Sequence, residues 1–243
     1  IGFRHFQGLL SVSLKQKIYI YDISNESLKI CKDYESKVVH NHEVIYSSSL
    51  IDIKENVIDL LILSTSAGVR FEILKSLCKS LNFLNIILEK IVFQSIDQFN
   101  EANELFKNLK QTNVWINLIR RENNFYNNIK HLLKKDKLIK AEVYGEDWGL
   151  ACNSIHFIDL VSFLISSKLK DLDMTLLKPK VFSSKRKGHI EFKGSITARF
   201  ENNTILTLTS SPSNIINNKY IFIHLCCENQ NISIVEGSYE SPF

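Results

Sequence analysis

Asn153, His156 and Asp159 recur at steps of three along an otherwise apolar stretch. In a helix this spacing keeps side chains on one face. An imidazole, with an ordinary pKa near 6.5, can accept and return a proton near neutral pH, and a neighbouring carboxylate can orient it. Burying such a pair costs free energy unless its members bond to each other or face a wet cleft. The stretch therefore predicts either a structural His/Asp pair or a general acid/base that lines a site.

The helix that carries these residues is expected to begin at an N-cap, Asn153 or Ser154, and to continue to Ile165. Apolar residues occupy most of its other positions, which is typical of a buried helix.

Polar residues also follow the apolar runs of the N-terminal half. Runs typical of strands at 17–22, 57–65, 85–90 and 113–117 alternate with helical patterns at 24–33, 68–81 and 96–109. This order predicts a doubly wound parallel sheet, whose ligands bind at the carboxyl ends of the strands. Those ends carry Asp22, Ser64, Thr65, Glu89, Lys90 and Asn117. We expect a binding site there, and a solvated strand end remains the alternative for Glu89 and Lys90.

A glycine and an acid have the spacing of a dinucleotide-binding unit. Gly2 begins a helical pattern over 1–10 and lies 20 residues before Asp22. This is the separation between the last glycine of a GxGxxG loop and the acid that binds the adenosine ribose. The first two glycines and the first strand do not occur in the sequence, so we expect an N-terminally truncated chain. Asp22 predicts NAD rather than NADP, because a carboxylate repels the 2′-phosphate.

The pattern changes after residue 117. A helix is expected over about 120–133, and strands are expected at 141–146, 174–182, 190–200, 205–210, 220–227 and 232–236. We therefore expect a first domain over 1–117 and a second over 118–243. The second should be an α+β domain with a large, mostly antiparallel open sheet and a helix packed on one face.

Taken together, these residues resemble the glucose-fructose oxidoreductase and inositol dehydrogenase family (Gfo/Idh/MocA). The ordered set comprises the helix that begins at Gly2 with Arg4-His5, then Asp22, Ser64-Thr65, Glu89-Lys90, Arg120-Arg121, and the helix with Gly149 and His156-Phe157-Ile158-Asp159. The resemblance implies an N-terminal Rossmann domain that binds a nicotinamide dinucleotide. It also implies a C-terminal domain that contacts substrate and usually forms an oligomer interface.

The resemblance implies roles for individual residues. For the cofactor, Ile1 and Gly2 would end the pyrophosphate loop, Asp22 would hold the ribose, and Ser64, Thr65, Glu89 and Lys90 would lie on the nicotinamide side. For catalysis, Lys90 would be the lysine of the family's Glu-Lys-Pro motif, His156 the acid/base, and Asp159 its neighbour. For the substrate, Lys90, Arg121, Asn153 and His156 would supply contacts.

Several positions depart from the family pattern. Ile91 replaces the proline after the lysine, which makes the family's cis turn less secure, because a cis bond before a non-proline residue costs roughly 2.5–4 kcal/mol. Cys152 stands where many members have aspartate, Ser154 replaces a glycine, and Asn124 replaces a proline. These departures keep a non-catalytic family member open as an alternative.

Composition narrows the class of protein. A net charge of +4 over 243 residues, with one basic cluster at Lys185-Arg186-Lys187, favours neither a nucleic-acid nor a membrane-surface partner. The sequence has no apolar run of about 18 residues and no leader pattern, so a cytoplasmic protein is expected. Five cysteines without CxxC or zinc spacing predict reduced thiols and no metal site.

These inferences predict an NAD-dependent oxidoreductase. Hydride would pass between nicotinamide and a secondary alcohol or ketone of a sugar, nucleotide-sugar or polyol, with His156 as base and Lys90 stabilising the alkoxide. The expected partners are this small substrate and further copies of the chain, through the C-terminal sheet. Two alternatives remain open: a ligand-sensing or scaffold protein, and an inactive truncated product.

Overall fold

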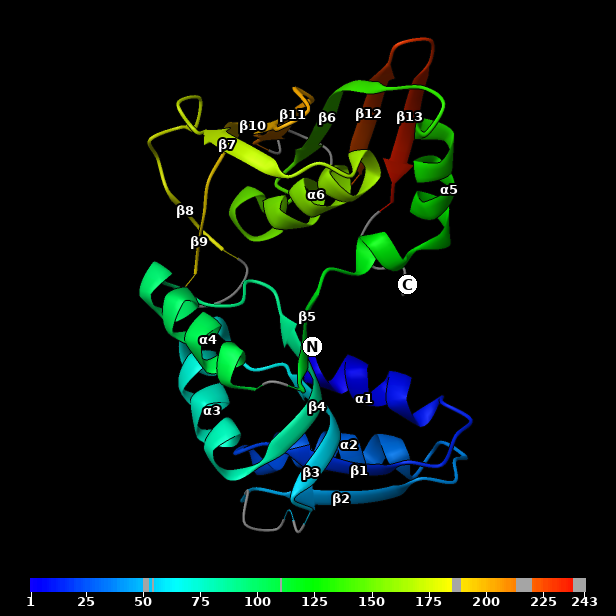
Figure 1. Ribbon diagram of the computed structural model, residues 1–243, viewed down its shortest axis with the longest axis vertical. Coiled ribbons are helices and arrows are strands. Elements are labelled where there is room, and N and C mark those ends of the chain that lie inside the picture. The colour runs from blue at the N-terminus through cyan, green and yellow to red at the C-terminus, as the bar shows by residue number, and fades with distance from the viewer. Residues whose placement is uncertain (50–52, 54, 110, 185–188, 213–219, 238–243) are drawn as a thin grey trace. The chain divides into compact units, whose positions relative to one another are not determined.

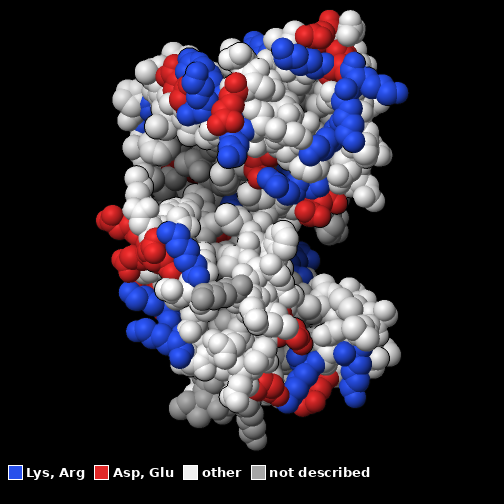
Figure 2. Space-filling model, viewed as in Figure 1, with Lys and Arg blue, Asp and Glu red and all other residues white. Residues whose placement is uncertain are grey.

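The computed structural model describes residues 1–49, 53, 55–109, 111–184, 189–212 and 220–237 (Figure 1). The chain divides into two compact units, Ile1–Asn117 and Leu118–Phe243. The basic run at 185–187 lies outside the described residues. On the face drawn in Figure 2, basic and acidic side chains are interspersed over the surface.

Helices and strands alternate through the N-terminal unit. Its elements are α1 (Gly2–Leu10), β1 (Lys17–Tyr21), α2 (Asn25–Glu35), β2 (Glu43–Ser47), β3 (Val57–Leu63), α3 (Ala67–Ser80), β4 (Asn82–Glu89), α4 (Ile96–Asn108) and β5 (Asn113–Asn117). Every strand pair is parallel, but the strands form two sheets, β1-β2 and β3-β4-β5. Two apolar clusters support them, one between α1, α2 and the first sheet, the other between α3, α4 and the second.

Two details of this unit differ from the sequence-based prediction. Strand β2 was not predicted, because its apolar centre is short and follows a polar loop with His40 and His42. Strand β4 begins at Asn82, three residues before the predicted start, since Phe83 is buried in the second apolar cluster. Neither difference moves the carboxyl ends of β3, β4 and β5, where the polar residues lie.

The C-terminal unit is built on one six-stranded sheet. Its elements are the 3₁₀ helix η2 (Ile119–Glu122), α5 (Asn124–Leu133), β6 (Leu138–Glu146), α6 (Leu150–Ile165), β7 (Leu169–Asp173), β8 (Phe182–Ser183), β9 (Ile190–Glu191), β10 (Gly194–Phe200), β11 (Ile205–Ser211), β12 (Ile221–Cys227) and β13 (Asn231–Glu236). The sheet order is β13-β12-β6-β11-β10-β7, and among the described strands of this sheet β6-β11 is the one parallel pair. Parallel strands followed by a larger, mostly antiparallel sheet confirm the predicted α/β class.

Helix α6 forms the centre of this unit's core. Phe157 and Leu160 of α6 are at most 1% exposed and belong to one apolar cluster with Ala141 and Val143 of β6. Helix α5 packs beside α6, as Figure 1 shows. Helix α6 is thus buried along most of its length, and its polar side chains are buried or half-buried: Ser154 is buried, and Asn153, His156, Asp159 and Ser162 are half-buried.

The start of α6 was predicted wrongly. The helix begins at Leu150, and its N-cap is Gly149, whose φ of 80° lies in the left-handed region that glycine tolerates. Asn153 and Ser154 are therefore inside the helix, and the Ser154 hydroxyl donates to the carbonyl of Leu150. The glycine allows the chain to turn sharply and start the helix one turn earlier.

The strand predicted at 174–182 was also wrong. Strand β7 ends at Asp173, whose carboxylate accepts hydrogen bonds from both the backbone N–H and the hydroxyl of Thr175. Such a local bond forms a turn in place of further pairing. The strand predicted at 190–200 is interrupted between β9 and β10, where Gly194 has a φ of 111°.

Among the described residues, no helix combines the length and apolar character needed to cross a membrane.

Candidate functional site

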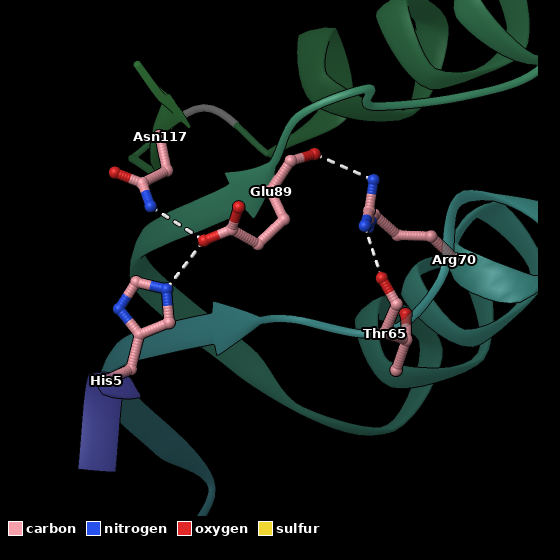
Figure 3. Close-up of polar contacts among 5 residues, drawn as sticks. All are labelled: His5, Thr65, Arg70, Glu89 and Asn117. Atoms are coloured by element: carbon pink, nitrogen blue, oxygen red, sulfur yellow. Dashed lines mark hydrogen bonds and ion pairs between the residues drawn. The ribbon is translucent and has the colours of Figure 1, made fainter. Parts of the chain in front are cut away.

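Glu89 lies at the centre of a polar cluster at the carboxyl ends of the N-terminal unit's strands (Figure 3). It ends β4 and is only 4% exposed. Its Oε1 lies 2.6 Å from His5 Nε2 of α1 and 2.6 Å from Asn117 Nδ2 at the end of β5. An ionised carboxylate only accepts hydrogen bonds, so both nitrogens donate to it. The register of β4 and β5 explains the second bond, because Glu89 and Asn117 are directly paired.

The surroundings of Glu89 favour its charged form. Burial alone would raise the pKa of this carboxyl, but the hydrogen bonds from His5 and Asn117, with the charges of His5 and Arg70, outweigh that effect and lower the pKa below its usual value. Glu89 is therefore a buried anion at neutral pH.

A buried arginine lies on the other side of Glu89. Arg70, in the first turn of α3, is 2% exposed and donates from its guanidinium to the backbone carbonyls of Glu89 and Thr65 (Figure 3). It also donates to the carbonyls of Ile91 and Val92. Burial lowers the pKa of Arg70, and the charge of Glu89 opposes that change. Arg70 thus joins the turn after β3 to the turn after β4.

The residues expected to hold a dinucleotide pyrophosphate lie close to the end of β3. Ile1 caps α1, and its carbonyl accepts from the backbone N–H of Arg4 at 2.8 Å. A Cβ placed on Gly2 would lie 2.7 Å from Ser64 Oγ, so any larger residue here would require the Ser64 hydroxyl to turn away. Thr65 Oγ1 is buried and has no hydrogen-bond partner among the described residues. The structure therefore brings Gly2, Ser64 and Thr65 together beside the Arg70 cluster.

Asp22 and Lys90 are placed by turns. Asp22 follows β1, and its Oδ1 accepts from the backbone N–H of Ser24 at 2.8 Å; Ser24 in turn caps α2. Lys90 follows β4, and the peptide bond between Lys90 and Ile91 is cis. How secure this turn is with isoleucine in place of proline stays a prediction.

In the C-terminal unit, the predicted residues on α6 have partners that sequence spacing did not indicate. The carboxylate of Asp159 accepts two bonds from the Arg121 guanidinium, one of them from Nε at 2.9 Å. Asn153 Nδ2 donates to the carbonyl of Trp148 at 2.7 Å. His156 is half-buried on the same helix. The structure brings Arg121 and Asp159 together as a pair, and the proposed orienting role of Asp159 toward His156 stays a prediction.

Sequence reasoning gave no individual role to three members of the Glu89 cluster. His5 lies one turn after Gly2, and Asn117 stood among the polar strand ends, so each had a signal. Arg70 had none, because a charged residue in a helical pattern ordinarily indicates a solvated face. Among the described residues, no group of three or more potential metal ligands occurs.

The comparisons by sequence give no relatives: no family model matches the chain, and no curated protein is significantly similar to it. Solved structures do resemble it. A probable dehydrogenase from Thermotoga maritima has a TM-score of 0.72 and 13% identity, with 98% of this chain and 78% of that chain covered. The myo-inositol dehydrogenase from Lactobacillus casei, in complex with NAD(H) and myo-inositol, has a TM-score of 0.70 and 14% identity, covering 96% and 70%.

A third similar structure is the WlbA dehydrogenase from Bordetella pertussis in complex with NADH and UDP-GlcNAcA. It has a TM-score of 0.68 and 14% identity, with 100% of this chain and 74% of that chain covered. The TM-scores establish a shared architecture, and at identities this low they establish nothing finer. The chain therefore has the fold of the Gfo/Idh/MocA-type dehydrogenases.

Proposed function

We propose that the protein is an NAD-dependent oxidoreductase that transfers hydride between nicotinamide and a secondary alcohol or ketone of a sugar, nucleotide-sugar or polyol. The observation that carries this proposal is the buried Glu89 carboxylate, followed by Lys90, at the carboxyl end of a parallel strand. That is where ligands of doubly wound sheets bind. Similar structures with this fold contain NAD(H) together with myo-inositol, or NADH together with UDP-GlcNAcA.

The residues at these strand ends fit a nicotinamide dinucleotide. The backbone of Ile1 and Gly2 at the start of α1 would hold the pyrophosphate, because the first N–H groups of a helix favour anions. Gly2 keeps this approach free of a side chain, and the buried Thr65 Oγ1 offers a polar contact without a partner among the described residues. Ser64, Thr65, Glu89 and Lys90 would contact the nicotinamide portion.

The adenosine ribose would bind to the Asp22 carboxylate. The same charge would repel a 2′-phosphate, so the proposal is for NAD over NADP.

When bound, the nicotinamide supplies hydride acceptance and return. The chain's own residues would handle the proton and the charge. His156 would take the proton from the substrate hydroxyl, since an imidazole titrates near neutral pH. The Lys90 ammonium would stabilise the oxyanion that develops on the substrate. Arg121 and Asn153 would contact other substrate oxygens, and Asp159 would support the imidazole while holding Arg121.

We further propose a homo-oligomer formed through the open face of the six-stranded sheet. Tyr144, Phe222 and Val235 lie in direct register on three neighbouring strands, and each is 44–57% exposed. A row of large apolar side chains on an open sheet face is typical of an interaction surface. The five free cysteines support a reducing, cytoplasmic location.

Fluorescence titration with NADH and NADPH tests the cofactor, and absorbance of the reduced nicotinamide tests turnover on polyols and nucleotide-sugars. We expect NADH to bind more tightly than NADPH. Asp22→Ala should weaken NADH binding about tenfold or more, because hydrogen bonds to a charged group contribute about 1.5–3 kcal/mol. His156→Ala should abolish turnover and leave NADH binding unchanged, whereas the exposed His131→Ala on α5 should change neither.

Failure of the wild-type chain to bind NADH would contradict the proposed cofactor for this chain and favour the alternative of an inactive truncated product. Tight NADH binding without turnover on any substrate of the class would instead favour the ligand-sensing alternative. Full turnover by the His156→Ala protein would remove the imidazole from the role of base.

A further inference from the structure

We propose that Arg70 is a positioning residue, whose buried guanidinium fixes the two turns that carry Thr65 and Lys90. This inference deepens the proposed function, on which it rests for the meaning of those two turns. The contacts that support it lie wholly within the N-terminal unit.

The Arg70 guanidinium divides its hydrogen bonds between the two turns (Figure 3). Nη1 donates to the carbonyl of Glu89 at 2.7 Å and to that of Val92 at 2.9 Å, and it also contacts the carbonyl of Ile91. Nη2 donates to the carbonyl of Thr65. One nitrogen therefore holds the turn after β4, and the other holds the turn after β3.

The chemistry of arginine suits this task better than that of other residues. A planar guanidinium presents its donors on several nitrogens in a rigid fork, whereas the lysine ammonium carries all of its donors on one nitrogen. Burial of the Arg70 guanidinium is unfavourable in free energy, because a buried cation loses its hydration. Leu74 and Phe71 on the same helix are buried apolar residues, and an apolar side chain at position 70 would avoid that cost but would leave the carbonyls of both turns without their donor. The benefit of arginine is thus the ordering of turn carbonyls.

The turn that carries Lys90 is held from two sides. Arg70 binds the backbone carbonyl of Glu89, while His5 and Asn117 bind its side-chain carboxylate. Loss of the backbone contacts would leave the carboxylate anchored and release the residues after it. Lys90 would then lose its alignment, although the strand that precedes it would stay in place.

The expected kinetic effect follows from the proposed role of Lys90. A group that acts on the developing oxyanion contributes chiefly in the transition state, and a misplacement of about 1 Å can cost on the order of 10²-fold. Arg70→Met should therefore lower kcat about 10- to 100-fold while KM for substrate changes only a few-fold. The matched control is Lys75→Met, which removes a partly exposed cation from the same helix without touching either turn.

We call the Arg70 guanidinium, together with the carbonyls of Thr65, Glu89, Ile91 and Val92 that it binds, the clamp. Hydrogen exchange of the ligand-free full chain tests this clamp without a measurement of activity. In Arg70→Met, peptides covering 64–67 and 89–93 should exchange at least tenfold faster, while peptides from the centres of β3 and β4 keep their protection. Arg70→Lys retains the charge, but all its donors lie on one nitrogen, which cannot occupy the positions of both Nη1 and Nη2, so it can hold one turn but not both. It should therefore speed exchange in one of the two segments and leave the other protected.

Unchanged exchange in both segments of Arg70→Met would overturn the proposal, and so would a uniform loss of protection across the N-terminal unit. If Arg70→Met does not fold, the Arg70→Lys pattern decides: two protected or two released segments would contradict the divided clamp. Wild-type protein that binds no NADH would remove the proposed function, yet faster exchange confined to the two turns would still support the clamp.

Discussion

The His5 contact to Glu89 allows a quantitative test of how the buried carboxylate is held. His5→Phe keeps an aromatic ring, slightly larger than the imidazole, but removes the nitrogen that donates to Glu89 Oε1 at 2.6 Å. A hydrogen bond to a charged group contributes about 1.5–3 kcal/mol. Because the His5 side chain is 23% exposed, water can partly replace the lost donor. We therefore expect the lower end, a loss of about 1.5–2 kcal/mol in the free energy of unfolding of the N-terminal unit.

A double-mutant cycle with Glu89→Gln isolates the part that depends on charge. Glutamine retains an acceptor for His5 and Asn117 but carries no charge, so His5→Phe should cost only the roughly 0.5–1 kcal/mol of a neutral hydrogen bond in that background. The coupling free energy should be about 1 kcal/mol. Native-state hydrogen exchange of β4 amides is the suitable assay, because it reports the opening of this unit separately from the other. The exposed His131→Phe on α5 is the control.

The pH dependence of the same variants has a definite sign. The pKa of Glu89 is lower in the folded protein than its ordinary value of 4.5. Its contribution to stability is thus fully present above pH 4.5 and is lost as the pH falls through the folded pKa. Wild-type protein should lose more stability below pH 4.5 than Glu89→Gln. Equal costs of His5→Phe in both backgrounds, with parallel pH profiles, would refute the claim that His5 holds an ionised Glu89.

Two further predictions concern packing in the N-terminal unit. Gly2→Ala would place a Cβ 2.7 Å from Ser64 Oγ, so the serine hydroxyl has to turn away; the change should cost about 1 kcal/mol or less, and the cost should vanish in a Ser64→Ala background, as the β4 exchange assay measures. Desolvation raises the pKa of the half-buried Cys78 thiol to about 11. At pH 8, Cys78 in the native chain should therefore react with a thiol reagent at least about 10²-fold more slowly than in denaturant, as followed by mass spectrometry; comparable rates would contradict the raised pKa.

The meeting of Glu89 and Asn117 could be predicted from sequence. Each follows an apolar run, and the carboxyl ends of parallel strands meet at one edge of a sheet. Strands β4 and β5 are connected by a single helical crossover, so their polar ends lie side by side once the two strands pair. The alternation of apolar runs and helical periods therefore predicted where the cluster lies, although it did not predict which hydrogen bonds form there.

The burial of Arg70 could not be predicted in the same way. In its helical pattern a charged residue is expected to face water, and the reason for its burial is the set of carbonyls of Thr65, Glu89, Ile91 and Val92. Those carbonyls come together only when two turns, separated by helix α3 and strand β4, fold next to each other. Local periodicity carries no information about this arrangement.

The partner of the Asp159 carboxylate could not be predicted from local spacing either. The step of three between His156 and Asp159 suggested a pair within one helix, yet the carboxylate accepts two bonds from Arg121, 38 residues earlier in the chain. A planar guanidinium matches both oxygens of a carboxylate, which an imidazole with one nitrogen in reach cannot do. Asp159 therefore couples η2 to α6, and a change at Arg121 should alter the face of α6 on which His156 lies. The two predicted roles, substrate contact for Arg121 and support of the imidazole for Asp159, thus belong to one joined pair and have to be tested together.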